Sequence, residues 1–160
     1  MIVVSDTSPI RALHFLRLME LLPRLYGEVF VPPAVAEELG NPRERFEPVQ
    51  VSEYSFITVQ APRDMSSHSA MLAELDAGES AALALAVELH ADYVLIDETD
   101  GRAIASRLGL TATGVVGVLG RAKRSKIIPL VRPLLDNLEG GLGFFLGKSF
   151  KEAALHDLGE

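Results

Sequence analysis

Residues 2–6 read IVVSD, and residues 93–97 read YVLID. In both stretches a short run of β-branched and other apolar residues ends in an aspartate. Runs of this kind, separated by helical segments, are typical of strands that are buried on both faces of a parallel sheet. Similar runs predict strands at residues 28–31, 110–113 and 56–59. Strands that alternate with helices predict a three-layer α/β/α fold with a mainly parallel central sheet.

Helical patterns fill the segments between these strands. The leucine-rich run that follows the first strand is expected to break at Pro23, because proline interrupts helices. Residues 34–39 predict a short helix opened by two prolines. Residues 80–90 are apolar almost all round, so that helix should be central. Residues 61–67, which contain Pro, Ser and Arg, predict a surface loop.

The last part of the chain has a different pattern. Ser149 and Glu152 have the spacing of a capping box and predict the start of a final helix. A chain of 160 residues suits one ordinary domain. We therefore expect an α/β domain over residues 1–135 and a helical extension over residues 136–160, packed on the same domain. Within the extension, the apolar residues 144–146 suit either an interface or a core helix.

Composition narrows the class of protein. Hydrophobic residues make up 48% of the chain and charged residues 23%, so a proper core can form. The chain has no cysteine, which excludes disulfides, thiolate zinc sites and a cysteine nucleophile. No stretch reaches the roughly 20 apolar residues of a membrane helix. The first residues lack a basic, then apolar, export signal, and we expect a cytoplasmic protein without a membrane partner.

Charge is unevenly distributed along the chain. The net charge of −7 argues against a nucleic-acid ligand, because phosphate contacts depend on Lys and Arg. Residues 101–135, however, contain no acid and carry +7, whereas the rest of the chain carries −14. This distribution suits a protein that holds cations on one side and a polyanion on the other. It is equally compatible with solvated helices that differ in charge.

Two aspartates fall where the predicted sheet should bind ligands. Asp6 and Asp97 each follow a buried strand, and ligands of parallel sheets gather beyond the carboxyl ends of the strands. If the strands are neighbours, two carboxylates about 4 Å apart repel by about 4 kcal/mol at an effective dielectric near 20. A proton, a basic side chain or a divalent cation must offset that repulsion. Alternatively, each aspartate caps the helix that follows it.

Three further acids can reach the same edge. Glu38 ends a short helix, where a negative charge opposes the helix dipole. Glu79 follows Asp76 by three residues and could form a reciprocal cap, and Asp100 in a first helical turn could be a ligand or a dipole charge. Taken together, Asp6, Glu38, Glu79 and Asp97 form a set of hard oxygen donors. Such a set, without histidine, indicates Mg²⁺ or Mn²⁺ rather than zinc.

The motifs VSDTSP at residues 4–9, VPPAVAEEL at 31–39, Gly78-Glu79, and LIDETD at 95–100 resemble those of a PIN domain. The chain is most similar to the small VapC-like PIN proteins, over about its first 125 residues. The resemblance implies Mg²⁺- or Mn²⁺-dependent endoribonuclease activity, commonly as the toxin of a toxin–antitoxin pair and commonly as a homodimer.

The resemblance also assigns residues. It implies that Asp6, Glu38, Glu79 and Asp97 are the metal-binding and catalytic acids, with Asp100 at a less regular fifth position. Thr7 or Ser8 matches a polar site beside the first aspartate. The sequence departs from the family at two places. The third acid is Glu79 rather than the more frequent aspartate, and Leu95 stands where Thr or Ser is usual.

The predicted reaction is hydrolysis of RNA phosphodiester bonds. Metal ions held by the four acids would lower the pKa of a water molecule and neutralise phosphate oxygens. Basic residues after Gly101, including Arg102, Arg121 and Lys123, are candidates for phosphate contacts. Arg102 could instead anchor one of the acids. Aromatic residues make up only 6% of the chain, which indicates no stacking platform for bases.

Two other function classes remain open from the sequence. The first is a catalytically silent PIN-like module that binds a protein partner, such as an antitoxin. The second is a Mg²⁺-dependent phosphotransfer or phosphohydrolase domain, which also places aspartates at strand ends. The segment SDTS at residues 5–8 lacks the second acid that a dehalogenase-type nucleophile needs.

Overall fold

The computed structural model describes residues 1–43 and 46–160. Its five described strands form one sheet in the order β3-β2-β1-β4-β5, and every described strand pair is parallel. The strands are β1 (Val3–Ser5), β2 (Val29–Val31), β3 (Ile57–Val59), β4 (Tyr93–Leu95) and β5 (Ala112–Thr113). The predicted three-layer α/β/α fold with a parallel sheet is confirmed.

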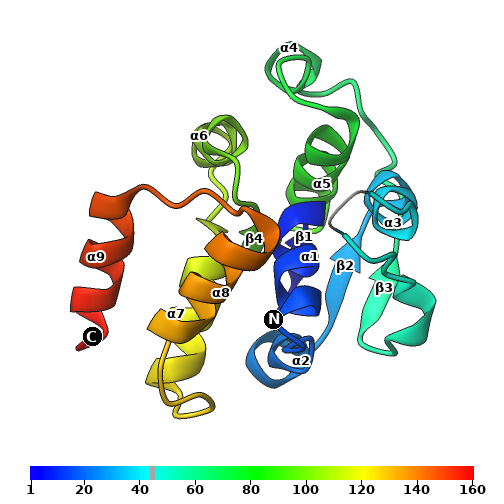
Figure 1. Ribbon diagram of the computed structural model, residues 1–160. Helices are drawn as coiled ribbons and strands as arrows, with labels where there is room; N and C mark the ends of the chain where they lie inside the picture. The colour runs from blue at the N-terminus through cyan, green and yellow to red at the C-terminus, as the bar shows by residue number, and fades with distance from the viewer. Residues whose placement is uncertain (44–45) are drawn as a thin grey trace.

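Helices cover both faces of the sheet (Figure 1). They are α1 (Thr7–Phe15), α2 (Leu21–Tyr26), α3 (Pro33–Gly40), α4 (Ser69–Leu72), α5 (Ala77–Glu88), α6 (Thr99–Arg107), α7 (Val115–Arg124), α8 (Arg132–Leu142) and α9 (Lys148–Asp157), with a 3₁₀ turn at Val51–Glu53. The alternation of side chains along β1 determines the layers. Val3 packs in the cluster formed by α1, α2, α7 and α8, whereas Val4 packs against α5 and α6.

The central helix matches its prediction. Residues 78–86 of α5 are all buried, including Glu79 and Ser80. A helix that is apolar on every side can lie only between other elements. Because α5 contacts β1, β4 and α3, its first turn is held beside the carboxyl ends of the central strands.

The helix boundaries differ from the sequence prediction in two places. The leucine-rich run breaks between α1 and α2, where Arg17 has a positive φ of 59°, and Pro23 lies inside α2. Proline is tolerated there because the first turn of a helix has no partners for its N–H groups. The predicted capping box at Ser149 is wrong: α9 already begins at Lys148, without a side-chain cap.

The C-terminal segment shares the core of the domain. The expected boundary at residue 135 falls inside α8, and Leu135, Leu138 and Leu155 are fully buried in the cluster that contains Val3. Gly141 also lies inside α8. A Cβ added there would stand 2.2 Å from the ring of Phe15, so glycine allows α8 to pack closely on α1. None of the described helices has the length and apolar character needed to cross a membrane.

Candidate metal and phosphate site

The backbone ladder fixes Asp6 and Asp97 at one edge of the sheet. Ser5 is in register with Leu95, so β1 and β4 are neighbours, as the prediction for the two aspartates required. The amide of Asp6 continues the ladder by donating to the Leu95 carbonyl at 2.9 Å. The amide of Ile96, just before Asp97, donates to the Thr113 carbonyl at 2.9 Å. Both carboxyl groups are therefore carried by backbone that has little freedom to move.

Burial makes the charged form of both aspartates costly. Asp6 is only 5% exposed, and burial raises its pKa to about 7, with further contributions from Glu79, Asp76 and Glu38. Burial likewise raises the pKa of Asp97 to about 6, although the Val115 amide partly offsets it. None of the described side chains forms an ion pair with either carboxylate.

Of the two aspartates, only Asp97 caps a helix. Asp6 makes no capping hydrogen bond to α1. Asp97 does cap a helix, but not the one that follows it. Its Oδ1 accepts a hydrogen bond of 2.8 Å from the Val115 amide at the start of α7. Its Oδ2 is buried without a hydrogen-bond partner among the described residues. One oxygen of Asp97 thus positions the carboxyl group and leaves the other for a ligand.

Gly114 makes room for the Asp97 carboxylate. A Cβ at position 114 would stand 2.4 Å from Asp97 Oδ1 and 3.3 Å from an Nη atom of Arg102. Arg102 also lowers the pKa of Asp97 slightly by its charge. Arg102 therefore lies next to Asp97, which leaves both of its predicted roles available, as an anchor for an acid or as a phosphate contact.

Glu38 is tied to the first turn of α1. The Thr7 hydroxyl donates to Glu38 Oε2 at 3.0 Å, and Arg43 lies 3.7 Å from Glu38 Oε1. The guanidinium of Arg11 donates to the backbone carbonyl of Glu38 at 2.6 Å. Arg11 thereby places a positive charge at the C-terminal end of α3, where it favours the helix dipole and holds the helix against α1.

Glu79 takes part in a reciprocal cap with Asp76. The Glu79 amide donates to Asp76 Oδ1 at 2.8 Å, and the Asp76 amide donates to Glu79 Oε2 at 3.4 Å. Glu79 therefore forms the reciprocal cap that the sequence allowed for it. Burial raises the pKa of Glu79, and the charge of Asp76 adds to that effect. The carboxyl group of Glu79 lies close to α6, because its carbon atom would be 3.8 Å from a Cβ added to Gly101.

Three carboxylates meet around Gly78, in the first turn of α5. A Cβ added to Gly78 would lie 3.1 Å from Glu38 Oε2, 3.5 Å from Asp6 Oδ1 and 3.6 Å from Asp76 Oδ1. Glycine leaves the space between them open. The sequence indicates Asp76 only as the partner of Glu79 in a reciprocal cap. In the structure its carboxylate also faces the space between Asp6 and Glu38.

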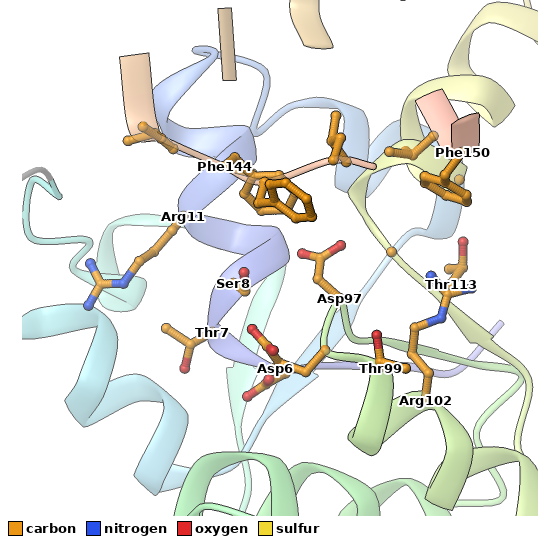
Figure 2. A pocket seen from close by; sticks show the side chains of 18 of the residues that line it. Asp6, Thr7, Ser8, Arg11, Asp97, Thr99, Arg102, Thr113, Phe144 and Phe150 are labelled. Carbon is orange, nitrogen blue, oxygen red and sulfur yellow. The ribbon is translucent and has the colours of Figure 1, made fainter. Parts of the chain in front are cut away.

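All five predicted acids line one cavity of about 1200 Å³. Asp6, Glu38, Glu79, Asp97 and the exposed Asp100 contribute to its wall. Thr7, Ser8 and Arg102 line it as well, as predicted for groups beside the site. Figure 2 shows Asp6 and Asp97 on the side of the cavity opposite the link between α8 and α9, which carries Phe144 and leads to Phe150 in α9.

The structure does not bring Arg121 and Lys123 to this cavity. The guanidinium of Arg121 lies 5.1 Å from the ring centre of Tyr26 and 5.3 Å from that of Tyr93. Lys123 forms an ion pair of 2.9 Å with Glu160. Both cations therefore make packing contacts outside the cavity, and their contact with phosphate stays a prediction.

Other residues that line the cavity were missed from the sequence. They include Arg11, Arg43, Arg124, Phe144, Phe145 and Phe150. Two of them had a signal in the sequence. Arg11 follows Thr7 by four residues, and Arg124 follows Gly120 by four, so each shares a helix face with a residue of the cavity wall.

The residues present fit a divalent cation. The wall offers carboxylate oxygens, which are the donors that Mg²⁺ and Mn²⁺ prefer, and it includes the unpartnered Oδ2 of Asp97. Within residues 1–43 and 46–160, no three acidic or histidine side chains are gathered closely enough to surround one ion as they stand. A cation bound between Asp6 and Asp97 would offset the cost of burying their charges.

The fold and the site define a parallel α/β protein with acidic side chains beyond its adjacent central strands. A family model described as "DUF3368: PIN domain" matches residues 2–160. The chain belongs to this PIN-domain family. The family assignment agrees with the resemblance found in the sequence.

The fold is also similar to that of a solved structure. It is "a PilT N-terminus domain protein SSO1118" from the archaeon Sulfolobus solfataricus P2. The match has a TM-score of 0.52 at 17% sequence identity, and it covers 76% of this chain and 92% of the other. At that identity the similarity concerns the fold alone. No curated protein matches the chain significantly.

Proposed function

We propose that the protein is a Mg²⁺- or Mn²⁺-dependent endoribonuclease that hydrolyses RNA phosphodiester bonds. The observation that carries the proposal is the pair of Asp6, which is buried, and Asp97, which is partly buried and whose Oδ2 atom is fully buried. The two carboxyl groups lie on adjacent strands, their pKa values are raised to about 7 and about 6, and one oxygen of Asp97 has no partner among the described residues. Carboxylates that are desolvated and form no ion pair cost stability in their charged form, and so indicate a ligand that supplies positive charge.

Each residue of the site has a proposed part. Asp6 and Asp97 would hold the ion, with Glu38 and Glu79 completing the set and Asp100 at its exposed margin. When bound, the ion would lower the pKa of a water molecule and neutralise the charge that develops on the phosphate. Thr7 orients Glu38 through its hydroxyl hydrogen bond. Ser8 lines the cavity beside this set, where its hydroxyl would contact the bound ligand.

Cations in the cavity wall are suited to hold RNA next to this site. Arg102 lies beside Asp97, and Arg43 and Arg124 line other parts of the same cavity. Guanidinium groups bind phosphate oxygens with two hydrogen bonds and fix the backbone without reading its sequence. They would counter the repulsion that a row of carboxylates exerts on a polyanion.

The test compares cleavage of single-stranded and structured RNA with Mn²⁺. We expect the double variant Asp6→Asn, Asp97→Asn to lose activity by more than about 100-fold, because both ion-binding groups are neutralised. Glu20→Gln is the matched control, since it removes one exposed acid outside the cavity. Equal cleavage by the double variant and the unchanged protein would contradict the proposal.

A catalytically silent module is the second candidate, and a specific observation favours it. Glu79 and Asp97 already accept hydrogen bonds as helix caps, and no three of the described acids are close enough together to surround one ion as they stand. Calorimetry with Mn²⁺ separates the two functions. A nuclease site should bind the ion and lose that binding in Asp97→Asn, whereas a module without metal chemistry should show no such heat.

The biological part of the proposal follows from the resemblance to VapC-like proteins. We propose a toxin that acts in the cytoplasm as a homodimer and is neutralised by an antitoxin protein. Induced expression should then arrest growth, and Asp6→Asn should abolish the arrest. Growth arrest that persists in Asp6→Asn would contradict a toxin role that depends on RNA cleavage.

A further inference from the structure

Two aromatic side chains at the mouth of the cavity are exposed to solvent. Phe145, in the link between α8 and α9, is 90% exposed, and Phe150, in the first turn of α9, is 51% exposed. Both line the cavity that contains Asp6 and Asp97. Phe144 also lines the cavity, but it is half-buried and packs against the core. Exposed aromatic rings beside a polar site are a feature of ligand-binding surfaces, because each offers apolar area and a π face.

The segment that carries these rings is anchored on both sides. Lys151 in α9 pairs with Glu139 and Asp136 of α8, at 2.6 Å and 2.5 Å. Arg132 at the start of α8 pairs with Glu152 of α9 at 3.1 Å. Because α8 is itself held on α1, the rings are presented at a defined place beside the acids.

The surroundings of the rings indicate the chemistry of the ligand. Arg124 of α7 lies near the end of α9. A Cβ added to Gly120 would be 3.6 Å from an Nη atom of Arg124 and also 3.6 Å from Leu158, the residue that follows α9. Arg102 lies deeper in the same cavity, beside Asp97. A ligand that occupies the cavity thus meets guanidinium groups and flat apolar rings together. Single-stranded nucleic acid has both features, as phosphates and bases.

We propose that Phe145 and Phe150 form an aromatic platform on which an unpaired base of single-stranded RNA stacks while its backbone reaches the acids. The low aromatic content indicates no such platform, yet four of the seven phenylalanines line the cavity, and Phe145 and Phe150 are exposed there. This inference rests on the proposed function, because it assigns an RNA-binding site to that nuclease. Base stacking on aromatic side chains is tolerant of sequence, so the platform would select unpaired over paired RNA.

The experiment measures binding separately from cleavage. Fluorescence anisotropy is recorded in EDTA with labelled 12-residue oligoadenylate, and with an abasic oligomer of the same length. Phe145→Leu, Phe150→Leu and the double variant keep apolar volume but remove the ring faces. Leu130→Ala is the matched control, because Leu130 is also 51% exposed and does not line the cavity. Phe145→Trp serves as a variant that keeps an aromatic face.

The expected results are as follows for oligoadenylate. Each Phe→Leu change weakens binding by about 5-fold to 150-fold per base that stacks, and Phe145→Trp retains it. Leu130→Ala binds as the unchanged protein does. The abasic oligomer binds more weakly than oligoadenylate to the unchanged protein and is insensitive to the substitutions, because it has no base to stack.

Several outcomes would overturn the platform. They are no binding of oligoadenylate by the unchanged protein, equal affinity in the double variant, or an equal loss for the abasic oligomer. A change from dimer to monomer in the double variant, with RNA affinity unchanged, would assign the rings to a protein interface instead. Cleavage assays with Mn²⁺ keep the two proposals apart. Stacking without cleavage contradicts only the nuclease function, and cleavage without stacking contradicts only the platform.

Discussion

Two sites in this molecule bury carboxylates, and their surroundings differ. The Glu160 side chain is 5% exposed and accepts hydrogen bonds from Lys123 Nζ at 2.9 Å, the Val131 amide at 2.8 Å and the Arg132 amide at 2.9 Å. Asp6 is buried as a whole residue, but no described side chain forms an ion pair with it. The fold can thus supply a counter-charge to a buried acid, and it does not supply one in an ion pair to Asp6.

The pKa values follow from this difference. At Glu160 burial raises the pKa, but the hydrogen bonds from Arg132, Val131 and Lys123 outweigh burial and lower it overall. At Asp6 burial dominates, and the neighbouring acids raise the pKa further. A compensated carboxylate stabilises the structure, here by fixing the start of α8. An uncompensated one costs stability until a proton or a cation binds.

The largest expected effect is a pH dependence of stability without metal. The pKa of Asp6 rises from 3.8 to about 7 on folding, so between these pH values the native state binds more protons than the unfolded state. The free energy of unfolding should therefore fall as pH rises from 4 to 8, by up to about 4 kcal/mol for this group. Urea unfolding in EDTA measures it. Asp6→Asn should remove that share of the slope and Glu20→Gln should not; an unchanged slope in Asp6→Asn would contradict the assignment.

A divalent cation should reverse much of this loss. At pH 8 and a Mn²⁺ concentration of 100 times its Kd, we expect stabilisation by about 2.7 kcal/mol. At pH 5 the effect should be small, because protons compete for the same carboxylates. Thermal unfolding with increasing Mn²⁺ measures both. Asp97→Asn should abolish the stabilisation, and Mn²⁺ that raises the melting temperature equally in Asp97→Asn would place the ion elsewhere.

The compensated site should respond in the opposite way. Glu160→Gln loses the charge of a group that holds Lys123 and two amides, and we expect it to lower stability at pH 7 by about 2 kcal/mol. Stabilisation by Mn²⁺ should remain. Glu152→Gln is the control, because its pair with Arg132 is exposed to solvent and contributes little to stability. A loss of Mn²⁺ binding in Glu160→Gln would break the contrast between the sites.

The sequence was sufficient to predict the buried strands and the two aspartates that follow them. Strands buried on both faces read as continuous apolar runs, and the residue after such a strand has a fixed place. That is why the positions of Asp6 and Asp97 at one edge of the sheet could be predicted. Glu38 and Glu79 were also predicted to reach this edge, because each lies at the end or start of a helix beside it.

The direction of exposed side chains was harder to predict. Arg121 and Arg124 lie three residues apart in one basic segment, yet Arg121 stacks on two tyrosines and Arg124 lines the cavity. The position of a charged residue in the sequence does not determine which neighbouring helix or strand its side chain contacts. Phe145 was missed for a similar reason, since an apolar residue in a glycine-rich link gives no sign of whether it is buried. Tertiary packing decides both.

The smallest expected effect concerns the space between the acids. Gly78→Ala adds a methyl group 3.1 Å from Glu38 Oε2, so the Glu38 carboxylate must move by a few tenths of an ångström. We expect stability to change by less than about 1 kcal/mol, since alanine also favours the helix. Mn²⁺ affinity, measured by calorimetry, should fall. Gly140→Ala in α8 is the matched control, because nothing lies within 4 Å of its added Cβ. It should gain stability without changing Mn²⁺ affinity, and equal affinities in the two variants would show that the space at Gly78 does not serve the cation.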